Sequence, residues 1–174
     1  MKLGSDCMPL VVGVPGTEVS EIELEVLRRV QPAGIILFSR NIATAEQTRE
    51  LVGQLEQLEP RPFISVDLEG GMVNRLTAIW GDLPTPAAAG AAGRRAVRTL
   101  GAAAGAACRH LGIGLDLAPT VDLACSGGCL CEQERCLDHD PERVVVLAKV
   151  CNEGLAEWGV SGCIKHCPGL GPGP

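Results

Sequence analysis

The sequence predicts an α/β fold built on a parallel sheet, and three observations lead to this prediction. Five short apolar runs, bounded by glycine, proline or charge, have the pattern of buried strands. Longer amphipathic segments lie between them, and repeated βα units require parallel strands joined by right-handed crossovers. With 174 residues, 46% of them hydrophobic and 21% charged, the chain is long enough to bury one core. We therefore expect a single domain over residues 1–174.

The predicted strands are rich in aliphatic and β-branched residues, which is typical of strands buried on both faces. They cover residues 10–14, 34–38, 63–66, 113–117 and 161–164. In a parallel sheet the residues that follow such strands emerge at one edge, where functional groups gather.

The first two helices are indicated by the residues at their starts. Ser20 and Glu23 have the spacing of a capping box, in which the two side chains bind free backbone amides. Thr44 and Gln47 repeat this spacing, and the second helix is expected to end near Pro60. Apolar stripes follow both starts, formed by Ile22, Val26, Leu27 and Val30 and by Leu51, Val52, Leu55 and Leu58.

The third and fourth helices have different signals. Residues 91–111 are rich in alanine and glycine, so we expect a helix whose backbone packs unusually close to the sheet, although glycine lowers its helix propensity. Asp140 and Pro141 are residue types preferred at an N-cap and in a first turn. Gly159 is positioned to end this fourth helix.

Two architectures have this order of elements. A doubly wound sheet usually carries a glycine-rich phosphate-binding turn after its first strand, but residues 12–17 match neither a dinucleotide fingerprint nor a P-loop. A barrel is therefore favoured. Because a complete (β/α)8 barrel takes about 250 residues, we expect the N-terminal five βα units of a TIM-type barrel, incomplete at the C-terminus.

Composition excludes several classes of partner. The net charge of −6 repels phosphate backbones, and 2% aromatic residues leave no stacking platform, so we expect no nucleic acid partner. No apolar run approaches the roughly 20 residues that cross a bilayer, and Met1 to Asp6 do not open a signal peptide. We expect no membrane partner and a cytoplasmic location. Nine cysteines, an odd number without an export signal, indicate reduced thiols.

Polar side chains directly follow the last three predicted strands. Carboxylates accept hydrogen bonds from hydroxyls, while lysine and arginine donate to ring oxygens or acyl groups. A rim that combines them suits a polyhydroxylated ligand, and a sugar is the natural candidate. The residues are Asp67, Glu69 and Arg75 after the third strand, Asp116 and Asp122 at the fourth, and Lys165 and His166 after the fifth.

Five segments together resemble glycoside hydrolase family 3, and more closely its bacterial β-N-acetylhexosaminidase branch. Residues 67–75 are similar to the family's D-x-E-G-G-x-V-x-R signature, which is highly specific. Residues 34–41 resemble its second strand and turn, and residues 114–123 its fourth-strand motif. Residues 134–137 resemble its R-S-F loop, and residues 165–169 its K-H-F-P-G-H-G element. The segments occur in the family's order and at its spacing.

This resemblance implies a retaining glycosidase that, in the full-length protein, releases terminal β-linked N-acetylglucosamine from cell-wall fragments or similar glycans, as in peptidoglycan recycling. Asp67 and Arg75 would hold hydroxyls of the terminal sugar. Arg135 would reach across the pocket, and Lys165 and His166 would complete it. No metal or organic cofactor is implied.

The resemblance also implies an acid/base histidine in the loop after the fifth strand and a nucleophilic aspartate further on. We expect both beyond Pro174, so the chain itself would contain no catalytic residue and would be inactive alone. A truncated, catalytically silent relative that binds sugar weakly is the alternative. Glu69 stays open between a ligand contact and a residue that binds backbone amides to hold its loop.

One further alternative is a thiol or metal protein built on a cysteine-rich loop. Its spacing lacks the repeated short cysteine pairs of structural zinc sites, so small buried thiols are the favoured interpretation. The residues are Cys125, Cys129, Cys131 and Cys136.

Overall fold

The computed structural model describes residues 7–171. The segments 1–6 and 172–174 lie outside it, and with them the residues on which the signal-peptide expectation rests and the end of the chain. Among the described helices, none has the length and apolar character needed to cross a membrane.

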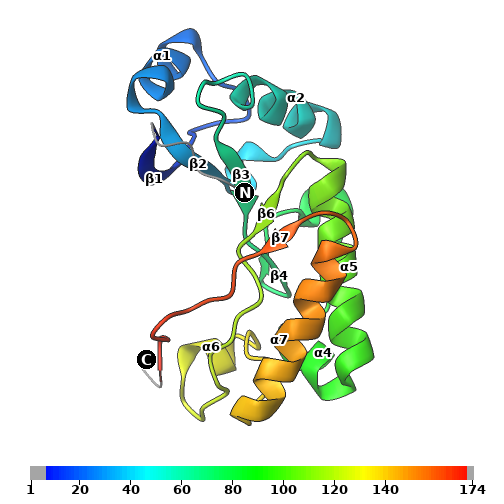
Figure 1. Cartoon of the computed structure of the whole chain (residues 1–174). Coiled ribbons are helices and arrows are strands. Elements are labelled where there is room, and N and C mark those ends of the chain that lie inside the picture. The colour runs from blue at the N-terminus through cyan, green and yellow to red at the C-terminus, as the bar shows by residue number, and fades with distance from the viewer. Residues whose placement is uncertain (1–6, 172–174) are drawn as a thin grey trace.

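A five-stranded parallel sheet forms the centre of the molecule (Figure 1). The α/β class and the parallel sheet are thus confirmed, and all five predicted strands are present in chain order. The last two are shorter than predicted. In sheet order the strands are β1 (Met8–Gly13), β2 (Pro32–Leu37), β3 (Phe63–Val66), β6 (Leu115–Asp116) and β7 (Ser161–Gly162).

The first two helices begin where the sequence predicts. In α1 (Glu21–Val30), the Ser20 hydroxyl accepts from the Glu23 amide at 3.3 Å, and the Glu23 carboxylate accepts from the Ser20 amide at 2.7 Å. In α2 (Ala45–Leu55), Thr44 accepts from the Gln47 amide, but the Gln47 side chain accepts from the amide of residue 43. The capping box is complete only in α1.

The predicted single helix over 91–111 is wrong at its start. The chain forms two helices, α4 (Pro86–Ala92) and α5 (Arg94–His110), which meet at Gly93 with φ of +94°. A glycine adopts this conformation without steric cost, and it interrupts the helix there.

We expected the glycines of α5 to approach the sheet, but they approach another helix. The neighbour is α7 (Pro141–Ala156), whose N-cap Asp140 accepts from the Glu142 amide at 3.0 Å as predicted. A Cβ atom on Gly101 would overlap the Cys151 carbonyl, and one on Gly154 would overlap the Arg98 carbonyl. Glycine therefore permits the two helix backbones to touch.

Shorter elements that periodicity does not reveal fill the connections. An antiparallel pair of strands follows β3 directly, and three short helices lie in loops. They are β4 (Leu68–Gly70), β5 (Val73–Asn74), the 3-10 helix η1 (Ser39–Asn41), α3 (Thr77–Trp80) and α6 (Cys129–Glu132).

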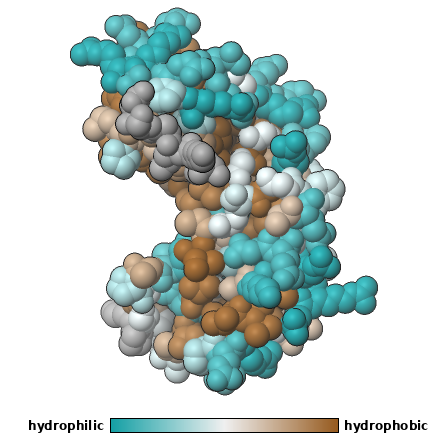
Figure 2. All heavy atoms as spheres, in the orientation of Figure 1, coloured by the Kyte–Doolittle hydropathy of each residue, from teal (hydrophilic) through white to brown (hydrophobic). Residues whose placement is uncertain are grey.

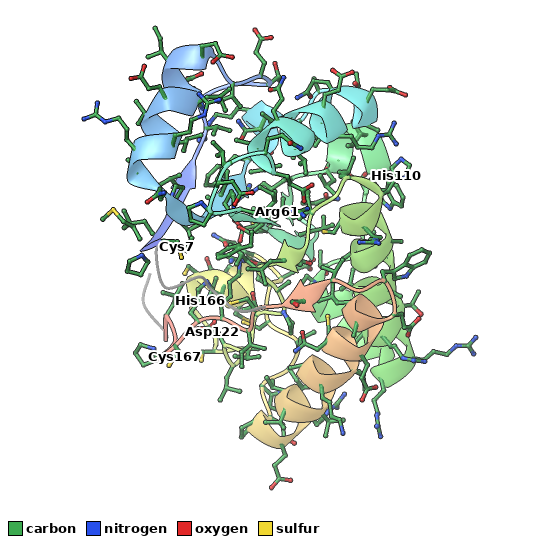
Figure 3. The ribbon with its side chains drawn as sticks, turned by 45° about the horizontal axis from the view of Figure 1, so that its top comes forward. Cys7, Arg61, His110, Asp122, His166 and Cys167 are labelled. Atoms are coloured by element: carbon green, nitrogen blue, oxygen red, sulfur yellow. The ribbon has the colours of Figure 1, made fainter. Side chains whose placement is uncertain are left out.

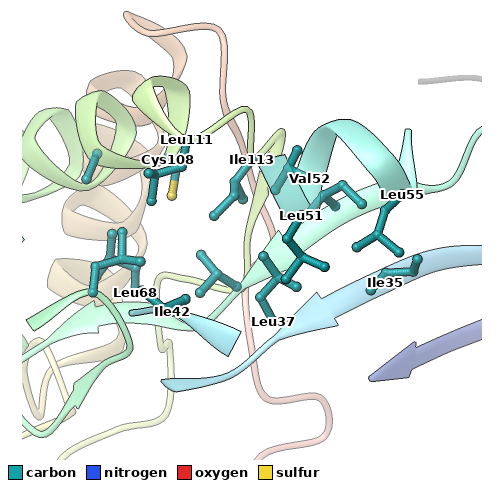
Figure 4. Packing of buried hydrophobic residues seen from close by; sticks show 14 of the residues in the cluster. Ile35, Leu37, Ile42, Leu51, Val52, Leu55, Leu68, Cys108, Leu111 and Ile113 are labelled. Carbon is teal, nitrogen blue, oxygen red and sulfur yellow. The ribbon is translucent and has the colours of Figure 1, made fainter. Parts of the chain in front are cut away.

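The main core lies between the sheet and its helices (Figure 4), and includes Ile35 and Leu37 of β2 against Leu51 and Leu55 of α2. Helices α5 and α7 lie together on one side of the molecule (Figure 1). Figure 2 shows a hollow on the other side with hydrophobic residues along it. The exposed apolar residues include Met8 in β1.

Candidate functional site

The register of the sheet brings three strand ends together. Val66 of β3 pairs with Asp116 of β6, which pairs with Gly162 of β7. The chain beyond these positions therefore emerges at one edge. A further parallel bridge joins Thr120 to Lys165, so Lys165 lies beside the loop that follows β6.

Glu69 is the centre of a charged cluster at this edge. Its side chain is 0% exposed, and both carboxylate oxygens accept from Arg135, at 2.8 and 2.9 Å. The Lys165 ammonium lies 2.6 Å from Oε1, and the Thr120 hydroxyl donates to Oε2 at 3.0 Å. Burial raises the pKa of Glu69, but the hydrogen bonds from Arg135 and Lys165 outweigh it and hold the pKa below its ordinary value. Glu69 is therefore an ionised group that fixes two cations.

Asp67 shares Lys165 with Glu69. The Lys165 ammonium donates to Asp67 Oδ1 at 2.6 Å, and the Arg75 guanidinium lies 3.8 Å from Oδ2. The longer distance makes the Arg75 contact an ion pair without a hydrogen bond. Asp67 thus retains accepting capacity on Oδ2.

The backbone at the end of α6 directs Arg135 towards Glu69. Glu134 has φ of +55°, its amide donates to the Cys131 carbonyl at 3.0 Å, and the Arg135 amide donates to the Leu130 carbonyl at 2.9 Å. This pair of bonds is a Schellman motif, which ends the helix. The Glu134 carbonyl also accepts from the residue 87 amide at 3.0 Å, which anchors the turn to α4.

His166 contacts Asp122 in the loop after β6. Its Nδ1 lies 2.7 Å from Asp122 Oδ2, which also accepts from the His166 amide at 3.0 Å. The Leu170 amide donates to Oδ1 at 2.7 Å. Burial raises the pKa of Asp122, but the hydrogen bonds from the His166 ring and the two backbone amides lower it by more, so the pKa lies below its ordinary value.

Asp116 lies behind the cluster and is fully buried. Its Oδ1 accepts from the Leu68 amide at 3.0 Å, between Asp67 and Glu69, while Oδ2 has no hydrogen-bond partner among the described residues. Burial raises the pKa of Asp116 well above its ordinary value, more than the Leu68 amide lowers it. The side chain therefore holds the backbone of this segment through Oδ1.

The structure brings the five sequence-predicted site residues to one edge but holds them differently. Asp67, Arg135 and Lys165 belong to the Glu69 cluster, Arg75 lies at its margin, and His166 is held by Asp122. The sequence analysis named Glu69, Asp116 and Asp122 among the polar residues near the strand ends but not among the five substrate contacts. For Glu69 a signal existed, since it lies two residues after Asp67, but contacts with Arg135 and Lys165 cannot be derived from spacing.

The cysteine-rich loop has no arrangement suited to a metal. Within residues 7–171, no group of three or more histidine, cysteine, aspartate or glutamate side chains is positioned to hold an ion. Cys136 is buried, and burial raises the pKa of its thiol to about 11. The interpretation as a small buried thiol fits Cys136, but Cys125, Cys129 and Cys131 are partly exposed.

The cluster can bind a ligand rich in hydroxyl groups. The Lys165 ammonium has three N–H groups, of which Asp67 and Glu69 engage two. Arg135 has five, of which two go to Glu69 and one to Gln133. Both cations therefore keep donors for a ligand, next to an accepting oxygen of Asp67.

Residues 8–174 match the family model described as the glycosyl hydrolase family 3 N terminal domain. A beta-hexosaminidase of Methylococcus capsulatus is 35% identical over an alignment of 160 positions, which covers 90% of this chain and 48% of that protein. One of Thioalkalivibrio sulfidiphilus is 33% identical over an alignment of 179 positions, which covers 98% of this chain and 50% of that protein. The chain spans about half the length of the curated relatives it matches.

Solved structures are similar over more than nine tenths of this chain. Native NagZ from Neisseria gonorrhoeae has a TM-score of 0.88 at 29% identity, over 95% of this chain and 50% of that chain. The same protein in complex with N-trifluoroacetyl-D-glucosamine has a TM-score of 0.86 at 28% identity, over 95% and 52%. A family 3 beta-N-acetylglucosaminidase from Paenibacillus has a TM-score of 0.84 at 30% identity, over 91% and 31%.

Proposed function

The chain belongs to glycosyl hydrolase family 3, and from this premise we propose that it forms the sugar-binding part of an enzyme that releases terminal β-linked N-acetylglucosamine. The observation that carries this proposal is the cluster in which Glu69 holds Arg135 and Lys165 beside Asp67. A related protein has been solved with N-trifluoroacetyl-D-glucosamine, which supports the choice of sugar.

In this site the terminal sugar would be bound by complementary hydrogen bonds. One hydroxyl would donate to Asp67 and accept from Lys165, while Arg135 would donate to a second oxygen. Arg75 and His166 would complete the contacts, as the family resemblance implies. Glu69 would not touch the sugar, because its carboxylate is buried and already accepts from three side chains.

Hydrolysis would proceed with retention of configuration through a covalent glycosyl-enzyme intermediate. The acid/base histidine and the nucleophilic aspartate are expected beyond Pro174. The five strands would then be the first part of an eight-stranded barrel, with residues 1–174 as its partial domain. The cytoplasmic location and the action on cell-wall fragments remain predictions from the sequence.

The test is hydrolysis of an aryl β-N-acetylglucosaminide by protein expressed from the complete natural reading frame. We expect turnover with a preference over the matching β-glucoside. Lys165→Ala removes a charged donor, so kcat/KM should fall about 10- to 100-fold. Lys149→Ala changes an exposed lysine on α7 and should leave kcat/KM unchanged.

Two outcomes would count against this function. Binding of N-acetylglucosamine without hydrolysis would favour a catalytically silent relative. Equal activity on both aryl glycosides, unaffected by Lys165→Ala, would contradict the site.

A further inference from the structure

Asp122 and His166 lie side by side near the C-terminal end of the described chain (Figure 3), far from His110. Asp122 is 5% exposed and receives three donors: the ring of His166, its amide, and the amide of Leu170. The chain from 166 to 170 therefore wraps around a single carboxylate. Gly169 completes the turn with φ of +107°, and a Cβ atom there would lie 3.2 Å from Asp122 Oδ1.

This geometry determines which ring nitrogen of His166 carries the proton. A carboxylate only accepts hydrogen bonds, so Nδ1 must donate to Asp122 Oδ2 across their 2.7 Å separation. In the neutral ring the other nitrogen, Nε2, then has an unshared electron pair.

We propose that Asp122 is a positioning residue that holds His166 in the Nδ1–H tautomer and so makes Nε2 a hydrogen-bond acceptor for a sugar hydroxyl. The substrate part of this proposal rests on the proposed function, while the tautomer does not. The neighbouring Lys165 can only donate. Adjacent residues 165 and 166 would thus offer one donor and one acceptor, which suits a ligand hydroxyl that both donates and accepts.

An amide cannot replace this carboxylate. Oδ1 accepts from Leu170 and Oδ2 accepts from His166, so both oxygens face N–H groups. Asparagine has one carbonyl oxygen and one NH2 group. If the oxygen faces Leu170, the NH2 group faces His166 and favours the opposite tautomer. If the oxygen faces His166, the NH2 group opposes the Leu170 amide and loosens the turn.

The direct test is 15N NMR of histidine-labelled protein from the complete natural reading frame, at a pH where the ring is neutral. The variant His166→Gln identifies the signal of His166 among those of the other histidines. We expect Nδ1–H in the wild-type protein and loss of its predominance in Asp122→Asn. The matched control is Asp138→Asn, because Asp138 contacts the ring of the exposed His139 at 3.1 Å and lies outside the cluster. It should leave the His166 signals unchanged.

An Nε2–H ring in the wild-type protein would overturn the proposal, even if Asp122→Asn fails to fold. An unchanged Nδ1–H ring in folded Asp122→Asn would overturn it as well. These readouts need no enzymatic activity, so they are independent of the proposed function.

The substrate contact has its own test in an active enzyme. Aryl N-acetylglucosaminides in which one hydroxyl at a time is replaced by fluorine cannot donate at that position. At one position, fluorine should raise KM about tenfold or more in the wild-type enzyme but little in Asp122→Asn or His166→Gln. The same increase in KM in all three enzymes at every position would overturn the acceptor role of His166.

Discussion

Replacing Glu69 by glutamine should be strongly destabilising, because both of its carboxylate oxygens face donors. The new NH2 group must oppose either Arg135 and Lys165 at one oxygen or Arg135 and Thr120 at the other. Breaking a buried ion pair costs about 3–5 kcal/mol. Arg135 and Lys165 keep 15% and 17% of their side chains exposed, so water partly solvates them and we expect about 2–4 kcal/mol.

The assay is urea unfolding of protein from the complete natural reading frame, followed by circular dichroism. Glu157→Gln is the matched control, because the Glu157 contact with Arg98 is exposed and should contribute less than about 1 kcal/mol. A cost of Glu69→Gln no larger than that of this control would refute the reasoning.

The pH dependence of this cost gives a second check. The pKa of Glu69 is lower in the folded state, so the ionised carboxylate stabilises the fold above its unfolded pKa, near 4.5. That stabilisation is lost as pH falls through the folded pKa. The cost of Glu69→Gln should therefore be largest at neutral pH and shrink below about pH 4.5. A cost that grows on acidification would contradict the account.

Three other predictions test the surroundings of the site. Gly154→Ala should lower stability by about 1–3 kcal/mol, because the new Cβ atom would overlap α5. Gly53→Ala lies in open space on α2 and should raise stability by about 0.5–1 kcal/mol. Similar thermal melts of the two variants would contradict the close contact between α5 and α7. Asp116→Asn keeps an oxygen that can accept from the Leu68 amide, while Asp116→Ala removes this acceptor and should cost about 1–3 kcal/mol more than Asp116→Asn. Equal costs in urea unfolding would show that the hydrogen bond to the Leu68 amide contributes nothing to stability. The 174-residue chain alone should aggregate, because β1 and β7 are free edges beside exposed apolar residues; a monomer by light scattering with a sharp cooperative melt would contradict this.

Local signals predicted the elements whose causes lie within a few residues. Ser20 and Glu23 cap α1 through contacts three positions apart, and Asp140 caps α7 two residues away. The break at Gly93 has no such signal, because glycine is compatible with both a helix and its interruption. The alanine and glycine pattern indicated a close approach but not that the partner would be α7.

The site could be predicted in part for the same reason. Asp67 and Lys165 were selected as candidates because each follows a strand, and parallel strands end at one edge. The contacts that organise them join residues far apart in the sequence: Glu69 to Arg135 spans 66 positions, and Asp122 to His166 spans 44. Such pairs depend on the sheet order and on the turn after α6, which spacing alone does not determine.

The central claim is that the cluster around Glu69 binds the terminal sugar. The most direct measurement is a crystal structure of the protein, expressed from its complete natural reading frame, with N-acetylglucosamine bound. The account predicts a sugar whose hydroxyls lie within hydrogen-bond distance of Asp67, Arg135 and Lys165, with Glu69 touching only protein. A sugar bound elsewhere, with this cluster unchanged and empty, would contradict it.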